Sequence, residues 1–187
     1  MKNASLNEYH GGSSVQLIVN EERATTLKEI SLNLPDITLN DRQLCDLELL
    51  STGVFSPLDG FMTRSDYESV LDRMRLQTNV LWPIPICLGI SDTTARTLEV
   101  GQSVTLRDHE GFLLAIMHIE DMWPVDRKKE ASLVYGTTDV THQGVKYLLG
   151  AVGDYYIGGK LEVLSAPLHF DFKQLRMTPK EIRRVYQ

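Results

Sequence analysis

The sequence GVFSPLDGFM (residues 53–62) decides the fold. It holds two phenylalanines, a leucine and a methionine, set among glycines and Pro57. A loop that faced water would not carry so much apolar side-chain surface, so we expect this stretch to be tucked into the core. Phe55 and Phe61, on either side of the proline, are the expected anchors.

A capped helix is predicted on each side of this stretch. The first covers residues 40–50, where Asn40 can cap the N-terminus and Gln43, at the third position, can reach back to the cap. Gly53 supplies a left-handed residue just beyond its end. The leucines that share its apolar face are Leu44, Leu47 and Leu50.

The second helix is predicted to begin at Thr63, with Asp66 completing a capping box. Its apolar side chains recur at the spacing i, i+3, i+4, i+7, which is typical of one helix face. They are Tyr67, Val70, Leu71 and Met74. The central stretch therefore lies between two amphipathic helices.

Elsewhere the chain reads as short helices and short strands. Helices are expected at 21–30, from Asp126 to Gly136, around 145–150, and from Thr178 onward with Pro179 and Glu181 in its first turn. Strands are expected at 15–19, 81–90, 103–107, 112–120, 155–157 and 161–164, with Gly158-Gly159 as a bulge or tight turn. Such strands suggest a small antiparallel sheet or a partly closed barrel.

Several blocks of the sequence resemble a known family in their order along the chain. RQLCDLELL at 42–50, GVFSPLDGFM at 53–62 and LWPIPI at 81–86 are the most specific. The others are His10-Gly11-Gly12, LRD at 106–108 with Glu110-Gly111, GTTD at 136–139, YIGGKLE at 156–162 and TPKEIR at 178–183. Together they resemble the amino-terminal domain of ATP sulfurylase (sulfate adenylyltransferase), from about residue 10 to the last residue. Asp41 and Gln143 stand where prolines are common in the family, and these departures affect only local loop geometry.

The resemblance implies an α+β fold, a PUA-like small β-barrel or sheet decorated by helices. Residues 1–177 would form this domain, and residues 178–187 would begin the helix that leads into a catalytic domain. That helix has a strong start and then stops, so we expect it to be cut rather than finished. Its apolar residues Ile182, Val185 and Tyr186 would meet the missing domain.

Composition indicates the number of domains, the cellular location and the classes of partner to expect. With 187 residues, of which 42% are hydrophobic, one globular domain is expected, and the longest apolar runs are too short to span a bilayer. Residues 1–10 lack the apolar core of a signal peptide, so we expect a cytoplasmic protein without a membrane partner. The net charge of −6 argues against a nucleic-acid partner. Cys45 and Cys87 are expected as buried reduced thiols, with a disulfide left open.

No catalytic, cofactor-binding or metal-binding residue is predicted in this chain. Gly158-Gly159-Lys160 lacks the earlier glycine and the final Ser or Thr of a phosphate loop, so a bulged strand is the favoured interpretation. None of the five histidines is spaced like a helical metal pair. His169 with Asp171 is a weak signal for an oriented imidazole, and Lys160 with Glu162 is expected to form a surface pair.

The resemblance also supplies the expected function. The family forms adenylylsulfate and pyrophosphate from ATP and sulfate, using a QTRNP-type segment that runs into an HxxH pair, and neither motif occurs here. We therefore expect a non-catalytic scaffold whose partners are the catalytic domain in cis and other subunits of a homo-oligomer, with Mg-ATP bound by the parent enzyme. A parent that also carries an adenylylsulfate kinase domain is left open. The alternative is a stand-alone PUA-like module that binds RNA or a protein, a function that would rest on the fold alone.

Overall fold

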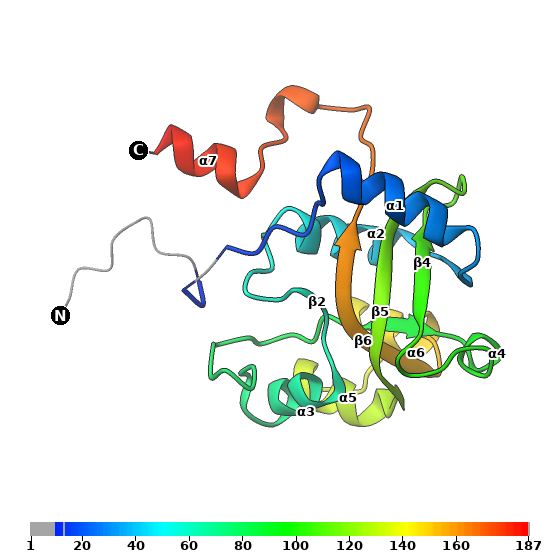
Figure 1. Cartoon of the computed structure of the whole chain (residues 1–187). Coiled ribbons are helices and arrows are strands. Elements are labelled where there is room, and N and C mark those ends of the chain that lie inside the picture. The colour runs from blue at the N-terminus through cyan, green and yellow to red at the C-terminus, as the bar shows by residue number, and fades with distance from the viewer. Residues whose placement is uncertain (1–9, 13, 187) are drawn as a thin grey trace. The chain divides into compact units, whose positions relative to one another are not determined.

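The computed structural model of the chain describes residues 10–12 and 14–186 (Figure 1). These residues fall into two compact units. The described residues of unit 1 lie within Met1–Gly60, Ser103–Met117 and Leu161–Gln187, and those of unit 2 lie within Phe61–Gln102 and His118–Lys160. Each unit has its own helices, whereas two long strands contribute residues to both.

The strands form one mixed sheet that is not closed. They are β1 (Asp36–Thr38), β2 (Gly60–Phe61), β3 (Leu88–Ile90), β4 (Ser103–Arg107), β5 (Leu113–Pro124) and β6 (Tyr155–Val163). Their order is β1-β4-β5-β6-β2, and β3 pairs with β6 off this path. The β1–β4 pair is parallel and the β3–β6 pair is antiparallel. The expected α+β class is confirmed, and an open sheet takes the place of the barrel.

The helices of unit 1 are α1 (Glu21–Ser31), α2 (Asp41–Ser51), the 3-10 turn η1 (Lys173–Leu175) and α7 (Pro179–Val185). The predicted capping box of α2 is confirmed: the side chain of Asn40 accepts from the amide of Gln43, and the side chain of Gln43 accepts from the amide of Asn40, both at 3.0 Å. Gly53 has φ +79°, as its role after the helix requires.

The helices of unit 2 are α3 (Arg64–Arg73), α4 (Asp92–Ala95), α5 (Arg127–Tyr135) and α6 (Gln143–Gly150). The capping box expected for α3 is wrong, because Thr63 makes no side-chain cap and Asp66 instead accepts from the amide of Gln77 at 2.7 Å. Met74 does not face the core either. It is 57% exposed and ends the helix in the left-handed conformation, with φ 52°.

The central stretch is buried in its second half. Leu58, Phe61 and Met62 are each less than one-tenth exposed, which confirms that the stretch packs into the core. Phe55 is only partly buried and Val54 is exposed, so the expectation that Phe55 is a core anchor is wrong, whereas that for Phe61 is confirmed. The reason is local: the amide of Phe55 bonds back to the carbonyl of Leu49 in the turn that follows α2, and this turn lies nearer the surface.

Three further expectations change. Residues 15–19 form no strand, and Ile18 makes an isolated parallel bridge to Val163 instead. Of 81–90 only β3 is a strand, whereas the two pieces around Gly158-Gly159 join into the single strand β6. Cys45 is exposed and Cys87 is only partly buried, so the expectation of two buried thiols is wrong, and the two residues form no disulfide.

Replacing Phe61 with alanine should lower the free energy of unfolding by about 3–5 kcal/mol, because a fully buried ring leaves a cavity behind. Phe55→Ala should cost clearly less, since part of that ring already meets water. Urea unfolding of both variants, with exposed Val54→Ala as the control, measures the difference. Equal losses for the two phenylalanines would show that Phe55 is a core residue after all.

Candidate functional site

The glycine-rich segment 158–160 lies inside a strand, not in a loop that could wrap a phosphate. The position of a Cβ on Gly158 would be 2.1 Å from the carbonyl oxygen of Met62. On Gly159 it would be 2.0 Å from the carbonyl oxygen of His118. Both glycines are therefore required by close backbone packing within β6 and its neighbours, as the bulged-strand interpretation expected.

Two histidines, His109 and His169, lie against carboxylates, and His142 accepts from a backbone amide. His169 Nε2 lies 2.8 Å from both carboxylate oxygens of Glu48, whereas Asp171 pairs with Arg176. The imidazole is thus oriented by a residue 121 positions earlier and not by its neighbour in sequence. Within residues 10–12 and 14–186, no group of three or more His, Cys, Asp or Glu side chains could hold a metal ion.

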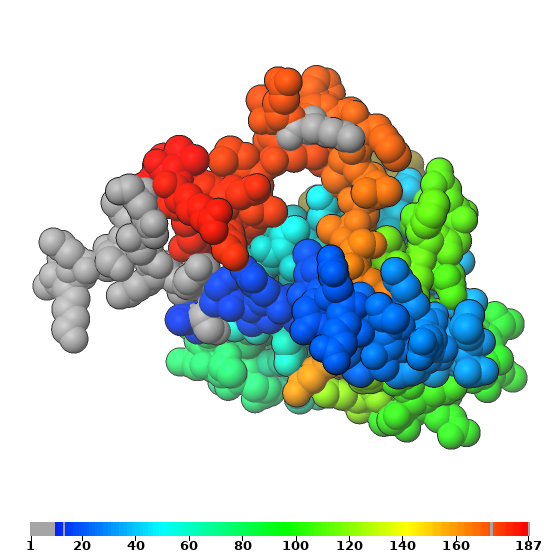
Figure 2. Space-filling model, turned by 45° about the horizontal axis from the view of Figure 1, so that its top comes forward, coloured from blue at the N-terminus to red at the C-terminus, as the bar shows by residue number. Residues whose placement is uncertain are grey.

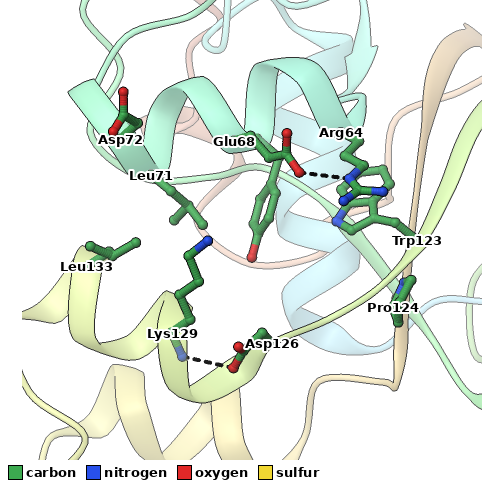
Figure 3. A pocket seen from close by; sticks show the side chains of 10 residues that line it. Arg64, Glu68, Leu71, Asp72, Trp123, Pro124, Asp126, Lys129 and Leu133 are labelled. Atoms are coloured by element: carbon green, nitrogen blue, oxygen red, sulfur yellow. Dashed lines mark hydrogen bonds and ion pairs between the residues drawn. The ribbon is translucent and has the colours of Figure 1, made fainter.

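A cavity of about 530 Å³ opens in unit 2 between α3 and α5 (Figure 3). Its apolar wall includes Leu71, Leu133 and the indole of Trp123. The remaining lining residues are Arg64, Tyr67, Glu68, Asp72, Pro124, Asp126 and Lys129. Apolar side chains with charged groups at the edge are typical of small-molecule sites.

Most charges around this cavity are already engaged. Arg64 Nε donates to Glu68 at 2.8 Å, one turn along α3. The carboxylate of Asp126 accepts from the amide of Lys129 at 3.0 Å and so caps α5. Figure 3 shows the side chain of Lys129 reaching from α5 toward Leu71 on α3, and no ion pair of its ammonium occurs in the described part of the chain.

A buried acid lies beside the cavity. Glu130 is 6% exposed, and its carboxylate accepts hydrogen bonds from Tyr67 at 2.9 Å and from Tyr156 at 3.1 Å. Burial raises the pKa of Glu130, and the two hydrogen bonds oppose that rise only in part. Burial also raises the pKa of each tyrosine. The rings of Tyr67, Tyr156 and Trp123 pack around this group with centroids 5.5–5.9 Å apart.

A second surface belongs to unit 1 and is apolar. Large apolar side chains between residues 168 and 186 are exposed, and Figure 2 shows this segment, in orange and red, at the surface. They are Leu168, Phe170, Phe172, Leu175, Met177, Ile182, Val185 and Tyr186. The capping box of Thr178 and Glu181 is formed as predicted, yet none of the residues of α7 is buried. We call this set the C-terminal apolar segment.

A family profile described as "PUA-like domain" matches residues 7–166. The chain belongs to the PUA-like domain family. Its expected PUA-like fold is thereby confirmed over most of the sequence. Among the described residues of this PUA-like domain, no helix has the length and apolar character needed to cross a membrane.

Curated relatives of this PUA-like domain carry the name sulfate adenylyltransferase. That of Mycosarcoma maydis is 39% identical over 184 residues, covering 96% of this chain and 32% of the relative. That of Emericella nidulans is 44% identical, covering 95% of this chain and 31% of the relative. The solved structure titled "Hexameric APS kinase from Thiobacillus denitrificans" is 33% identical with a TM-score of 0.75, covering 96% of this chain and 31% of that one. The resemblance seen in the sequence is confirmed, and the chain spans about a third of the length of these relatives.

Glu130→Gln should change how the stability of the domain depends on pH. Between about pH 4.5, the ordinary value for glutamate, and the raised folded-state pKa, the folded chain holds a proton that the unfolded chain has lost. The free energy of unfolding of the parent therefore falls as the pH rises across that window. Glutamine removes this decline and still accepts both tyrosine hydrogen bonds.

Urea unfolding at a series of pH values from about 4.5 to about 8 tests this expectation. The variant should become more stable relative to the parent as the pH rises. Glu29→Gln, at an exposed position of α1, should follow the parent throughout. Parallel profiles for Glu130→Gln and the parent would contradict a raised pKa at the buried carboxylate.

Proposed function

We propose that this chain is the N-terminal, non-catalytic domain of a cytoplasmic sulfate adenylyltransferase, which forms adenylylsulfate and pyrophosphate from ATP and sulfate. The observation that carries the proposal is the match to enzymes of this name over nearly the whole chain but only a third of theirs. The remaining two-thirds would supply the catalytic groups. A boundary near residue 177 remains part of this proposal.

The chemistry of the reaction supports a non-catalytic role. Attack of a sulfate oxygen on the α-phosphorus requires cationic groups and amide donors held around a triphosphate and a dianion. The cavity in unit 2 does not fit Mg-ATP, because the carboxylates of Glu68, Asp72 and Asp126 outnumber the cations of Arg64 and Lys129. Neither family motif for catalysis is present in the sequence. Mg-ATP would therefore bind to the part of the enzyme outside this chain.

The C-terminal apolar segment is the surface that we assign to the catalytic domain. A patch of large apolar side chains on a folded domain usually marks a surface that another protein surface covers. Tyr186 is 83% exposed and Val185 is 70% exposed, on a helix too short to be stable without packing. Packing of the catalytic domain against α7 would bury both side chains.

The structural neighbour extends the proposal to assembly. Its title names a hexamer and an APS kinase, the enzyme class that would consume adenylylsulfate. A homo-oligomeric parent is therefore part of what we propose, and a kinase domain in the parent would fit the same likeness. The alternative of an RNA-binding module has no supporting observation, since the net charge is −6.

The purified 187-residue chain should release no pyrophosphate from ATP in the presence of sulfate and magnesium, whereas the full-length protein should. Loss of even one preorganised donor typically costs about a hundredfold in rate, and here the whole set is absent. Assaying both proteins side by side measures the contrast. Sulfate-dependent release by the chain at a rate near that of the full-length protein would overturn the non-catalytic assignment.

The double variant Val185→Ser with Tyr186→Ser should distinguish a covered surface from a free one. In the isolated chain the free energy of unfolding should change by less than about 0.5 kcal/mol, as is usual for exposed positions. In the full-length protein the midpoint of thermal unfolding should fall, because the packing against the catalytic domain is lost. Leu32→Ser, 81% exposed at the end of α1, serves as the control. No change in the full-length protein would exclude α7 as the contact.

A further inference from the structure

We infer that the cavity between α3 and α5 binds a small organic monoanion, with its single carboxylate at Lys129 and its apolar body against Leu71, Leu133 and Trp123. This inference does not rest on the proposed function, because every residue that carries it lies in unit 2 and none belongs to the C-terminal apolar segment. It adds a ligand site to a domain proposed above only as a scaffold.

The cavity has the size and the wall that such a ligand needs. Its volume of about 530 Å³ falls within the range of roughly 300–1,000 Å³ that is usual for small-molecule sites. Leu133 is 51% exposed, so a wall of the cavity is an apolar side chain that half meets water in the absence of a ligand. An apolar body of one ring would cover that surface and gain the free energy of its removal from water.

Lys129 determines the sign of the charge that the cavity prefers. Arg64 is paired with Glu68, whereas the described residues include no ion-pair partner for the ammonium of Lys129. The carboxylate of Asp126 already accepts a hydrogen bond from the backbone amide of Lys129, as the cap of α5. Figure 3 shows the carboxylate of Asp72 turned away from Lys129, so it does not compete for the ammonium. An incoming carboxylate would therefore find one free cation.

Trp123 provides a second and independent indication. Its side chain lines the cavity and is only 3% exposed, and its indole N–H has no acceptor among the described residues. A buried donor without an acceptor destabilises the folded state, and an oxygen of a ligand would supply the missing acceptor. The indole and the ammonium of Lys129 would thus be the two donors of one site.

The edge of the cavity limits the ligand to one negative charge. The carboxylates of Glu68, Asp72 and Asp126 line it, so a dianion or a polyphosphate would meet stronger repulsion than a single carboxylate does. Sulfate and ATP, the substrates of the proposed parent enzyme, are excluded by this rule.

The test uses 3-phenylpropionate as the probe and the 187-residue chain as the protein. The indole N–H signals of Trp82 and Trp123, distinguished by a Trp82→Phe variant, are followed by NMR during titration. The Trp123 signal should shift to saturation. Lys129→Met, which keeps the apolar stem and removes the charge, should weaken binding about tenfold. Lys128→Met, on the same helix and outside the cavity, should bind like the parent.

A neutral probe and a cavity-filling variant provide two further tests. The neutral isostere 3-phenylpropanamide should bind about tenfold more weakly than the acid, and equally to the parent and to Lys129→Met. Leu133→Trp, at a position exposed enough to accept the larger side chain, should fill the cavity and abolish binding while the thermal midpoint stays near that of the parent. No shift of the Trp123 signal, equal binding by Lys129→Met and Lys128→Met, or displacement of the probe by equimolar sulfate or ATP would overturn the inference.

Discussion

The fold depends on the close approach of backbone to backbone at Gly158 and Gly159 of β6. Any side chain there would place a Cβ about 2 Å from the carbonyl oxygen of Met62 or of His118. Because neither residue has a side chain, the backbone of β6 can lie this close to Met62, which follows β2, and to His118 in β5. Glycines that would suggest a phosphate-binding loop in sequence serve strand packing here.

The features that could be predicted from the sequence are hydrogen-bonded motifs whose members lie within a few residues of one another. The capping boxes at Asn40 and at Thr178 formed as expected because each needs only a neighbour three positions on. Thr63 and Asp66 have the same spacing, yet the box is absent because the amide of Gln77, eleven positions along, takes the carboxylate. A local pattern thus predicts a structure only when no distant donor competes for the same group. The α+β class and the PUA-like family were predicted from the order of several sequence motifs along the chain.

The candidate site could not be predicted for the same physical reason. Tyr67 and Glu130 are 63 positions apart, and Glu48 and His169 are 121 apart, so their spacing carries no signal. The available hint was the position of Glu130 beside Ala131, on the face of a helix that packs inward. The described chain thereby carries two surfaces of different chemistry. One is an apolar segment suited to a protein partner, and the other is a cavity with one free cation.

The division into units also bears on how the protein is made. Unit 1 is assembled from three stretches of chain and unit 2 from two, so the chain crosses between them four times and neither unit is one continuous fragment. A ribosome releases the N-terminal residues first, and unit 1 stays incomplete until Leu161 and the residues after it have emerged. By then every residue of unit 2 has been synthesised. Contacts between such distant stretches form slowly. Strand β5 is complete at Pro124 but lacks its neighbour β6 until Val163 has emerged, so its edge is open to association with other nascent chains in the meantime.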